Sequence, residues 1–301
     1  MADETIAGGS AGPLRLTILG AAAAWSMRAA RASSSYLVEL HDQALLLDLG
    51  QGSFAEVAAR RDPAALRAVL ISHLHPDHCI DLVPLRHYLK YGRTPPATVE
   101  LRGPGELRSR FDALTGEAGF LANLPGAPLA PGTITLGPFE VTVGRVTHVG
   151  ESFAFRVAPA ASSRQVAPRI GPGNPAAAGR VAPQLTSSGE NDGSGMGRGL
   201  VYSGDCGRPD DLLPLLRRGD TLLCEASYGP GPVVEGPNHL DSPGAARAAR
   251  DGGASALVLT HILDGMDVAA TRRAARAVFD GPVVVARPGL TLDVTQGTGP
   301  G

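Results

Sequence analysis

Short apolar runs, each closed by glycine, proline or a polar cluster, recur along the chain and predict β-strands. They span 14–20, 35–40, 44–49, 68–72, 99–101, 133–147, 153–157, 199–203, 221–225, 256–260, 282–287 and 290–294. A hairpin is expected across 41–43, and a turn at Gly137-Pro138 divides the run 133–147 into two strands. Apolar residues at helical spacing predict helices over 53–61, 80–90, 106–114, 210–217, 242–251 and 268–279. The helix over 210–217 is expected to break or kink at Pro214. Helices interleaved with strands favour an α/β protein whose sheets are covered by helices.

Two segments lack this pattern. Residues 1–13 are small and glycine-containing, and we expect them to be disordered. Residues 158–199 are rich in Ala, Pro, Gly and Ser and have almost no large apolar side chain, so we expect a flexible insertion. The remaining chain, 14–301, is interpreted as one domain carrying that insertion, an ordinary size for a large α/β domain.

Composition narrows the class of protein. Hydrophobic residues make up 43% of the 301 residues. The net charge is −2, so the overall electrostatic field of the protein does not attract nucleic acid. The three cysteines form no CxxC motif, which favours a reducing cytoplasm without a disulfide framework. The acidic start Met1-Ala2-Asp3-Glu4 is unlike a signal peptide, and the apolar stretch 19–25 is too short to span a membrane. We therefore expect a cytoplasmic protein that does not enter a membrane.

The segment His73-Leu74-His75-Pro76-Asp77-His78 contains three of the eight histidines and an aspartate. In an extended loop the imidazoles of His73 and His75 point to one side. Asp77 and His78 then turn toward a second point. This arrangement suits two neighbouring cations better than one.

Three more polar residues follow apolar runs at strand ends, where sites collect. His148 follows the run 143–147, Asp205 follows 200–204, and His261 follows 257–260. The predicted ligand sets are His73, His75 and His148 at one cation, Asp77, His78 and His261 at the other, with Asp205 bridging. Nitrogen and carboxylate ligands without thiolate suit Zn²⁺, with manganese or iron as alternatives. Two such cations about 3.5–4 Å apart can share a water molecule.

These motifs, taken in order, resemble those of the metallo-β-lactamase superfamily. The HxHxDH signature matches residues 73–78, and the later ligand motifs match His148, Ser203-Gly204-Asp205 and Thr260-His261. The resemblance covers about residues 14–294 apart from the insertion. It implies a metal-dependent hydrolase with an αββα sandwich and two metals at one edge of the sheets.

Finer motifs resemble the ribonuclease Z and cyclic-nucleotide phosphodiesterase branch. They are residues 222–227, which include Glu225, followed by Asn238-His239-Leu240. The resemblance implies that His239, oriented by Glu225, protonates the leaving oxygen. Residues 152–156, 202–205 and 224–227 look like the short bacterial atypical class II phosphodiesterases. Aspartate at the bridging position argues against the antibiotic-hydrolysing branch.

We therefore expect a phosphodiesterase acting on a small phosphodiester such as a 3′,5′-cyclic nucleotide, with Asp77 also orienting the attacking hydroxide. A tRNA 3′-processing endonuclease is less favoured, because the insertion has few cations and no aromatic residue. Those cations are Arg164, Arg169, Arg180 and Arg198. A thioester or lactone hydrolase and a non-catalytic binding protein also stay open. The sequence leaves undetermined the natural substrate, the metal, any role of the insertion in substrate binding, and whether the chain forms a homodimer.

Overall fold

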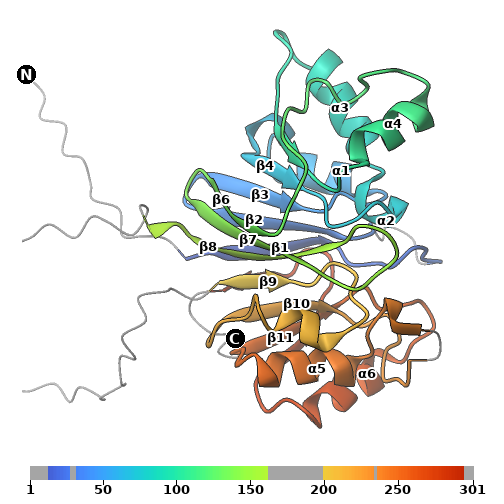
Figure 1. Cartoon of the computed structure of the whole chain (residues 1–301), viewed down its shortest axis with the longest axis vertical. Helices are drawn as coiled ribbons and strands as arrows, with labels where there is room; N and C mark the ends of the chain where they lie inside the picture. Colours follow the sequence, from blue (N-terminus) through green and yellow to red (C-terminus); the bar gives the residue numbers. More distant parts are fainter. Residues whose placement is uncertain (1–12, 28–31, 162–198, 234–235, 295–301) are drawn as a thin grey trace, which may run out of the picture.

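Two β-sheets face one another at the centre of the computed structural model, which describes residues 13–27, 32–161, 199–233 and 236–294 (Figure 1). The first sheet has the order β13-β1-β2-β3-β4-β5, formed by β1 (Arg15–Gly20), β2 (Ser35–Leu40), β3 (Gln43–Leu47), β4 (Ala68–Leu70), β5 (Glu100–Arg102) and β13 (Thr291–Asp293). The second has the order β12-β11-β10-β9-β8-β7-β6, formed by β6 (Gly132–Leu136), β7 (Phe139–Arg145), β8 (Phe153–Pro159), β9 (Leu200–Tyr202), β10 (Thr221–Glu225), β11 (Ala256–Thr260) and β12 (Val283–Val285).

Helices cover the outer face of each sheet (Figure 1). The first sheet carries α1 (Ser53–Ala58), α3 (Leu82–Tyr91) and α4 (Leu107–Thr115), and the second carries α5 (Ser242–Asp251) and α6 (Val268–Arg276). The layers therefore follow one another as helix, sheet, sheet and helix, which confirms the αββα sandwich. Among the described residues, no helix is long and apolar enough to cross a membrane.

Burial on both faces explains why central strands such as β3 and β11 read as unbroken apolar runs, whereas the outer strand β7 alternates between buried and half-exposed residues. In β3, Leu45 and Leu47 pack in the core between the two sheets, whereas Leu46 packs in the core under α3. Successive side chains of a strand point to opposite faces, so a sheet covered on both sides needs apolar residues at every position. In β11 the same alternation sends Val258 inward and Leu259 toward α5.

One predicted helix is wrong. Residues 210–217 do not form an α-helix, because only a short 3₁₀ helix is present, at Pro209–Leu212, and the chain then continues in turns. Pro214 cannot donate the backbone hydrogen bond to Asp210 that an α-helix would need there. The sequence interpretation also missed α2 (Pro76–Cys79), a short helix that begins inside the histidine cluster.

The boundary of the predicted insertion also needs correction. Ala158 and Pro159 belong to β8, where they pair with Glu140 and Phe139 of β7. Alanine and proline counted toward a linker-like composition, but Ala158 is fully buried in the sheet. Residues 162–198 lie outside the described residues, as do residues 1–12, so the expectations for these two segments stay predictions.

The three cysteines are buried and form no disulfide, as expected. Burial raises the pKa of Cys79 to about 12, so its thiol is protonated at neutral pH. Cys206 is completely buried, and burial raises its thiol pKa as well. Both side chains act as small packing residues beside the histidine cluster.

Candidate metal centre

Three imidazole nitrogens and one carboxylate oxygen converge where β4, β7 and β9 end. His75 Nδ1 lies 3.1 Å from His73 Nε2 and 3.2 Å from His148 Nε2. Asp205 Oδ2 lies 3.6 Å from His73 Nε2 and 3.9 Å from His148 Nε2. The structure thus brings together the first predicted ligand set.

A second group of atoms lies beside the first and shares Asp205. His261 Nε2 lies 3.1 Å from Asp77 Oδ2 and 3.2 Å from His78 Nε2. Asp205 Oδ1 lies 3.3 Å from His78 Nε2, and Asp205 Oδ2 lies 3.7 Å from His261 Nε2. One carboxylate therefore faces both groups. Asp77 and His78 reach this point because α2 turns the chain directly after His75.

Hydrogen bonds on the far side of three rings fix which nitrogen carries the proton. His148 Nδ1 donates to the carbonyl oxygen of Asn238 at 2.6 Å, and His78 Nδ1 donates to Asp48 Oδ2 at 2.7 Å. His261 Nδ1 lies 2.9 Å from the Ser227 hydroxyl, which itself donates to Glu225 at 2.6 Å and therefore accepts from the ring. In the neutral form of each ring, Nε2 then presents a lone pair to the cluster.

Interatomic spacing and charge both fit divalent cations. Tetrahedral Zn²⁺ ligands with bonds of about 2.0–2.1 Å lie about 3.3 Å apart. The neighbouring donor atoms of the first ligand group are separated by similar distances, 3.1–3.9 Å. Burial holds the pKa of His73 well below its usual range and lowers the pKa of His148, so both rings are neutral ligands at pH 7. Oδ1 of Asp205 is buried without a hydrogen-bond partner of good geometry among the described residues. A cation between the two groups would satisfy it.

For Asp205, His78 and Asp77, neighbouring groups favour the charged form and outweigh the effect of burial on the pKa. Burial opposes charge on Asp205, but the imidazoles of His261 and His78 hold its pKa well below the usual range. Burial likewise opposes charge on His78, but the carboxylates of Asp205 and Asp48 hold its pKa above the usual range. Burial also opposes charge on Asp77, but its hydrogen bond with His261 and the imidazoles of His78 and His261 together hold its pKa below the usual range. A cation bound by His78 would therefore compete with protonation of this ring.

Glu225 and His239 form a hydrogen-bonded pair beside these clusters. His239 Nδ1 donates to Glu225 Oε1 at 3.0 Å, and its ring stacks at 5.8 Å from that of His261. Glu225 is fully buried, whereas the His239 side chain is 25% exposed. Because Nδ1 is held by Glu225, the Nε2 edge is available to a substrate. Burial opposes charge on this ring, but the hydrogen bond to Glu225 and the negative charges of Glu225 and Asp205 together raise the pKa of His239 to about 9.

Asp48 supports the site and was missed by the sequence interpretation. It is fully buried and accepts hydrogen bonds from the amide and hydroxyl of Ser72, from His78, and from the Tyr202 hydroxyl at 2.6 Å. A usable signal was present, because Asp48 follows the apolar strand β3 as His73 follows the β4 run. The predicted strand 44–49 included Asp48, whereas its φ of 57° takes it out of β3.

A family model described as "Beta-lactamase superfamily domain" matches residues 46–262. The chain belongs to the beta-lactamase superfamily. The match includes both ligand groups and the Glu225–His239 pair, and two sheets flanked by helices are the fold expected of a member. The resemblance inferred from the motifs is therefore confirmed at the level of family and fold.

Relatives in this superfamily cover nearly the whole chain. An uncharacterized protein of Mycobacterium tuberculosis is 30% identical over an alignment of 279 residues, which covers 90% of this chain and 88% of that protein. The probable metallo-hydrolase YhfI of Bacillus subtilis is 25% identical, over 93% of this chain and 100% of that protein. A ribonuclease Z of Salinispora arenicola is 25% identical, over 93% and 96%.

Solved structures agree with these matches. The crystal structure of the metallo-beta-lactamase fold protein YhfI superposes with a TM-score of 0.71 at 24% identity, covering 93% of this chain and 100% of that one. The protein is accordingly a metallo-hydrolase related to ribonuclease Z, with His/Asp clusters that could hold metal ions.

Proposed function

We propose that this metallo-hydrolase is a phosphodiesterase, with a 3′,5′-cyclic nucleotide as its substrate. The observation that carries the proposal is the Glu225–His239 pair, placed beside two ligand groups that share Asp205. Hydrolysis of a diester must deliver one proton to the departing alkoxide, and His239 has an Nε2 edge available for that transfer.

The ligand assignment is part of this proposal. His73, His75 and His148 would hold one cation, Asp77, His78 and His261 a second, and Asp205 would bridge them; Zn²⁺ suits the donors best, with manganese or iron as alternatives. When bound, the cations supply Lewis acidity that offsets negative charge developing on the phosphoryl oxygens.

The side chains of this chain carry the proton transfers. Water adds to phosphorus and releases one proton to solvent, the ester P–O bond breaks, and the leaving oxygen takes the proton of His239 Nε2, which solvent then restores. Glu225 holds the opposite edge of the ring through Nδ1, which orients it and favours its protonated form. We assign to Asp77 a second role, orienting the attacking water with a carboxylate oxygen.

A variant pair tests the role of His239. Replacing its imidazole by an amide, His239→Gln, should lower kcat on cyclic AMP by about 10²–10⁴-fold, the usual worth of general acid catalysis. Metal content should stay unchanged, since His239 Nδ1 is bound to Glu225. The matched control is His87→Gln, because His87 is an exposed histidine on α3. Equal kcat values in the two variants would contradict the assignment.

A second candidate is tRNA processing, favoured by the similarity to a ribonuclease Z. Metal-loaded protein should be incubated in parallel with cyclic AMP and with a precursor tRNA, with products separated by chromatography and gel. Cyclic AMP turnover without tRNA cleavage supports our choice, whereas efficient tRNA cleavage without cyclic AMP turnover defeats it. Failure to hydrolyse bis-p-nitrophenyl phosphate would instead favour a thioester or lactone hydrolase. Protein that binds no transition metal after reconstitution would favour a binding protein.

A further inference from the structure

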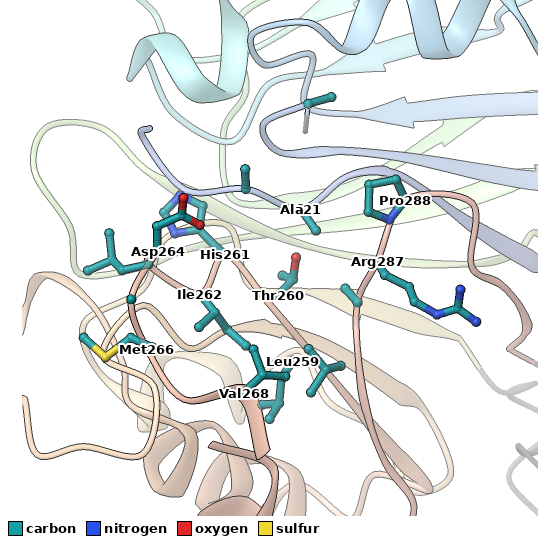
Figure 2. A pocket seen from close by; sticks show the side chains of 16 residues that line it. Ala21, Leu259, Thr260, His261, Ile262, Asp264, Met266, Val268, Arg287 and Pro288 are labelled. Carbon is teal, nitrogen blue, oxygen red and sulfur yellow. The ribbon is translucent and has the colours of Figure 1, made fainter. Parts of the chain in front are cut away.

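A cavity of about 390 Å³ opens beside His261, between the segment after β1 and the loop that joins β11 to α6 (Figure 2). Most of its lining is apolar, and its walls include Ala21, Ala22, Leu259, Ile262, Val268 and Val285. In Figure 2, Ala21 lies on one side of the space, and Leu259, Ile262 and Val268 lie on the other. Alanines on one wall leave room that larger side chains would fill.

Backbone pairing fixes these walls. Ala22 forms isolated β-bridges with Ser33 and with Ile262, which ties the segment after β1 to the loop after β11. The amide of Ala286 donates to the carbonyl oxygen of Leu259 at 2.8 Å. Below them, the Thr260 hydroxyl is hydrogen-bonded to Tyr36 at 2.8 Å. A cavity held open in this way binds a ligand without first being ordered.

Polar groups occupy the rim. Asp264 accepts hydrogen bonds from the Ser26 hydroxyl at 3.0 Å and the Met27 amide at 2.7 Å. Arg287 lies at the end of the cavity opposite His261 (Figure 2) and is exposed. Within the described residues its guanidinium has no hydrogen bond or ion pair. Hydrogen-bonding groups at the edge of an apolar slot suit a planar heterocycle, which has apolar faces and a polar edge.

A second cavity, of about 450 Å³, lies on the other side of the centre beside His75, and its chemistry differs. Its lining includes Glu106, Glu151 and Arg110. These charges are paired locally, since Arg110 lies 3.3 Å from Glu106 and Glu151 accepts from the Gly105 amide at 2.7 Å. An apolar ring in this second cavity would displace water from the charged side chains and would gain few apolar contacts. Of the two cavities, only the one beside His261 suits a base.

We propose that the cavity beside His261 binds the base of a nucleotide whose phosphate lies at the two ligand groups. The inference rests on the phosphodiesterase function proposed above. His261 belongs both to the cavity wall and to the second ligand group, so the two sites adjoin at this residue. The volume lies near the lower end of ligand pockets, about 300–1,000 Å³, which matches one nucleoside-sized group. The adaptable thioether of Met266 in the wall suits the face of a ring.

Two ligands that differ only by the base provide the test. Calorimetric titration of zinc-loaded protein with adenosine 5′-monophosphate and with ribose 5-phosphate gives two Kd values. Their ratio isolates the contribution of the base, because the phosphate and the sugar are shared. We expect the nucleotide to bind at least about tenfold more tightly, equivalent to about 1.4 kcal/mol.

Two variants fill the cavity from opposite walls. Val268 is 42% exposed at the start of α6, and Ala21 is half-buried, so Val268→Trp and Ala21→Leu add volume at the cavity wall. Each should bring the ratio of Kd values down to about 1–2. The matched control is Leu114→Trp on α4, since Leu114 is 61% exposed and lies outside the cavity. This variant should keep the wild-type ratio.

Failure of the inference is separable from failure of the proposed function. If the protein hydrolyses bis-p-nitrophenyl phosphate but binds the two ligands equally, the base site is wrong and the phosphodiesterase function stands. A ratio that stays within about twofold of wild type in both filling variants also overturns it, because the base then binds elsewhere. If no diester is hydrolysed, the proposed function is wrong, and the inference that rests on it is wrong as well.

Discussion

Asp48 gives the sharpest test of how the metal centre is supported. Its side chain is fully buried, and its two oxygens accept four hydrogen bonds, from Ser72 N at 2.6 Å, Ser72 Oγ at 2.7 Å, His78 Nδ1 at 2.7 Å and Tyr202 at 2.6 Å. The substitution Asp48→Asn keeps the size of the side chain. It also keeps the backbone, because asparagine tolerates the φ of 57° found here.

The expected cost follows from counting acceptors. An asparagine carbonyl oxygen accepts two hydrogen bonds and its NH₂ accepts none, so at least two of the four bonds to Asp48 are lost. Each buried donor left unsatisfied costs about 1–3 kcal/mol, which gives a loss of about 2–6 kcal/mol in unfolding free energy. The ring of His78 also loses a fixed orientation, which should weaken metal binding by about 10–100-fold.

Two measurements check these values. Urea unfolding of the metal-free protein gives the change in stability, and competition with a chromophoric chelator gives the Zn²⁺ affinity. The matched control is Asp280→Asn, because Asp280 is an exposed aspartate away from the cluster. If Asp48→Asn matches the control within about 1 kcal/mol and about threefold in affinity, the reasoning about this residue is refuted.

Three further outcomes are expected. Asp205→Ala should abolish diester hydrolysis and lower metal content in elemental analysis, because both ligand groups share this carboxylate; full activity would contradict its bridging role. The raised pKa of His239, about 9, means that the protonated acid is present below that pH. The kcat profile should therefore fall as pH rises through about 9, and Glu225→Gln should move that limb to lower pH; a profile unaffected by the variant would exclude the pairing. Asp220→Ala removes the carboxylate 2.7 Å from the buried Arg156 guanidinium and should lower unfolding free energy by about 3–5 kcal/mol in urea melts. Unchanged stability would show that this ion pair contributes little.

Local pattern was enough to predict most of the fold. The sequence pattern located the described strands of both sheets to within a few residues. The central strands were found because a sheet covered on both faces needs apolar side chains at successive positions. The prediction from local pattern was wrong over 210–217. The spacing of apolar residues favoured a helix there, but Pro214 cannot donate the hydrogen bond that would continue it. The prediction also failed at Ala158, where small residues with the composition of a linker pair with β7.

The sequence by itself determined the candidate ligands, because His and Asp at strand ends form a local signal and the HxHxDH motif is contiguous. What only the tertiary structure decided is how those ligands are held. Asp48 meets Tyr202 across 154 positions, and Ser227 reaches His261 across 34. Hydrogen bonds between residues so far apart in the sequence depend on which strands become neighbours. The chemical character of a single residue does not predict which strands these are. The cavity beside His261 has the same origin, since its walls come from the segment after β1, from β11 and from β12.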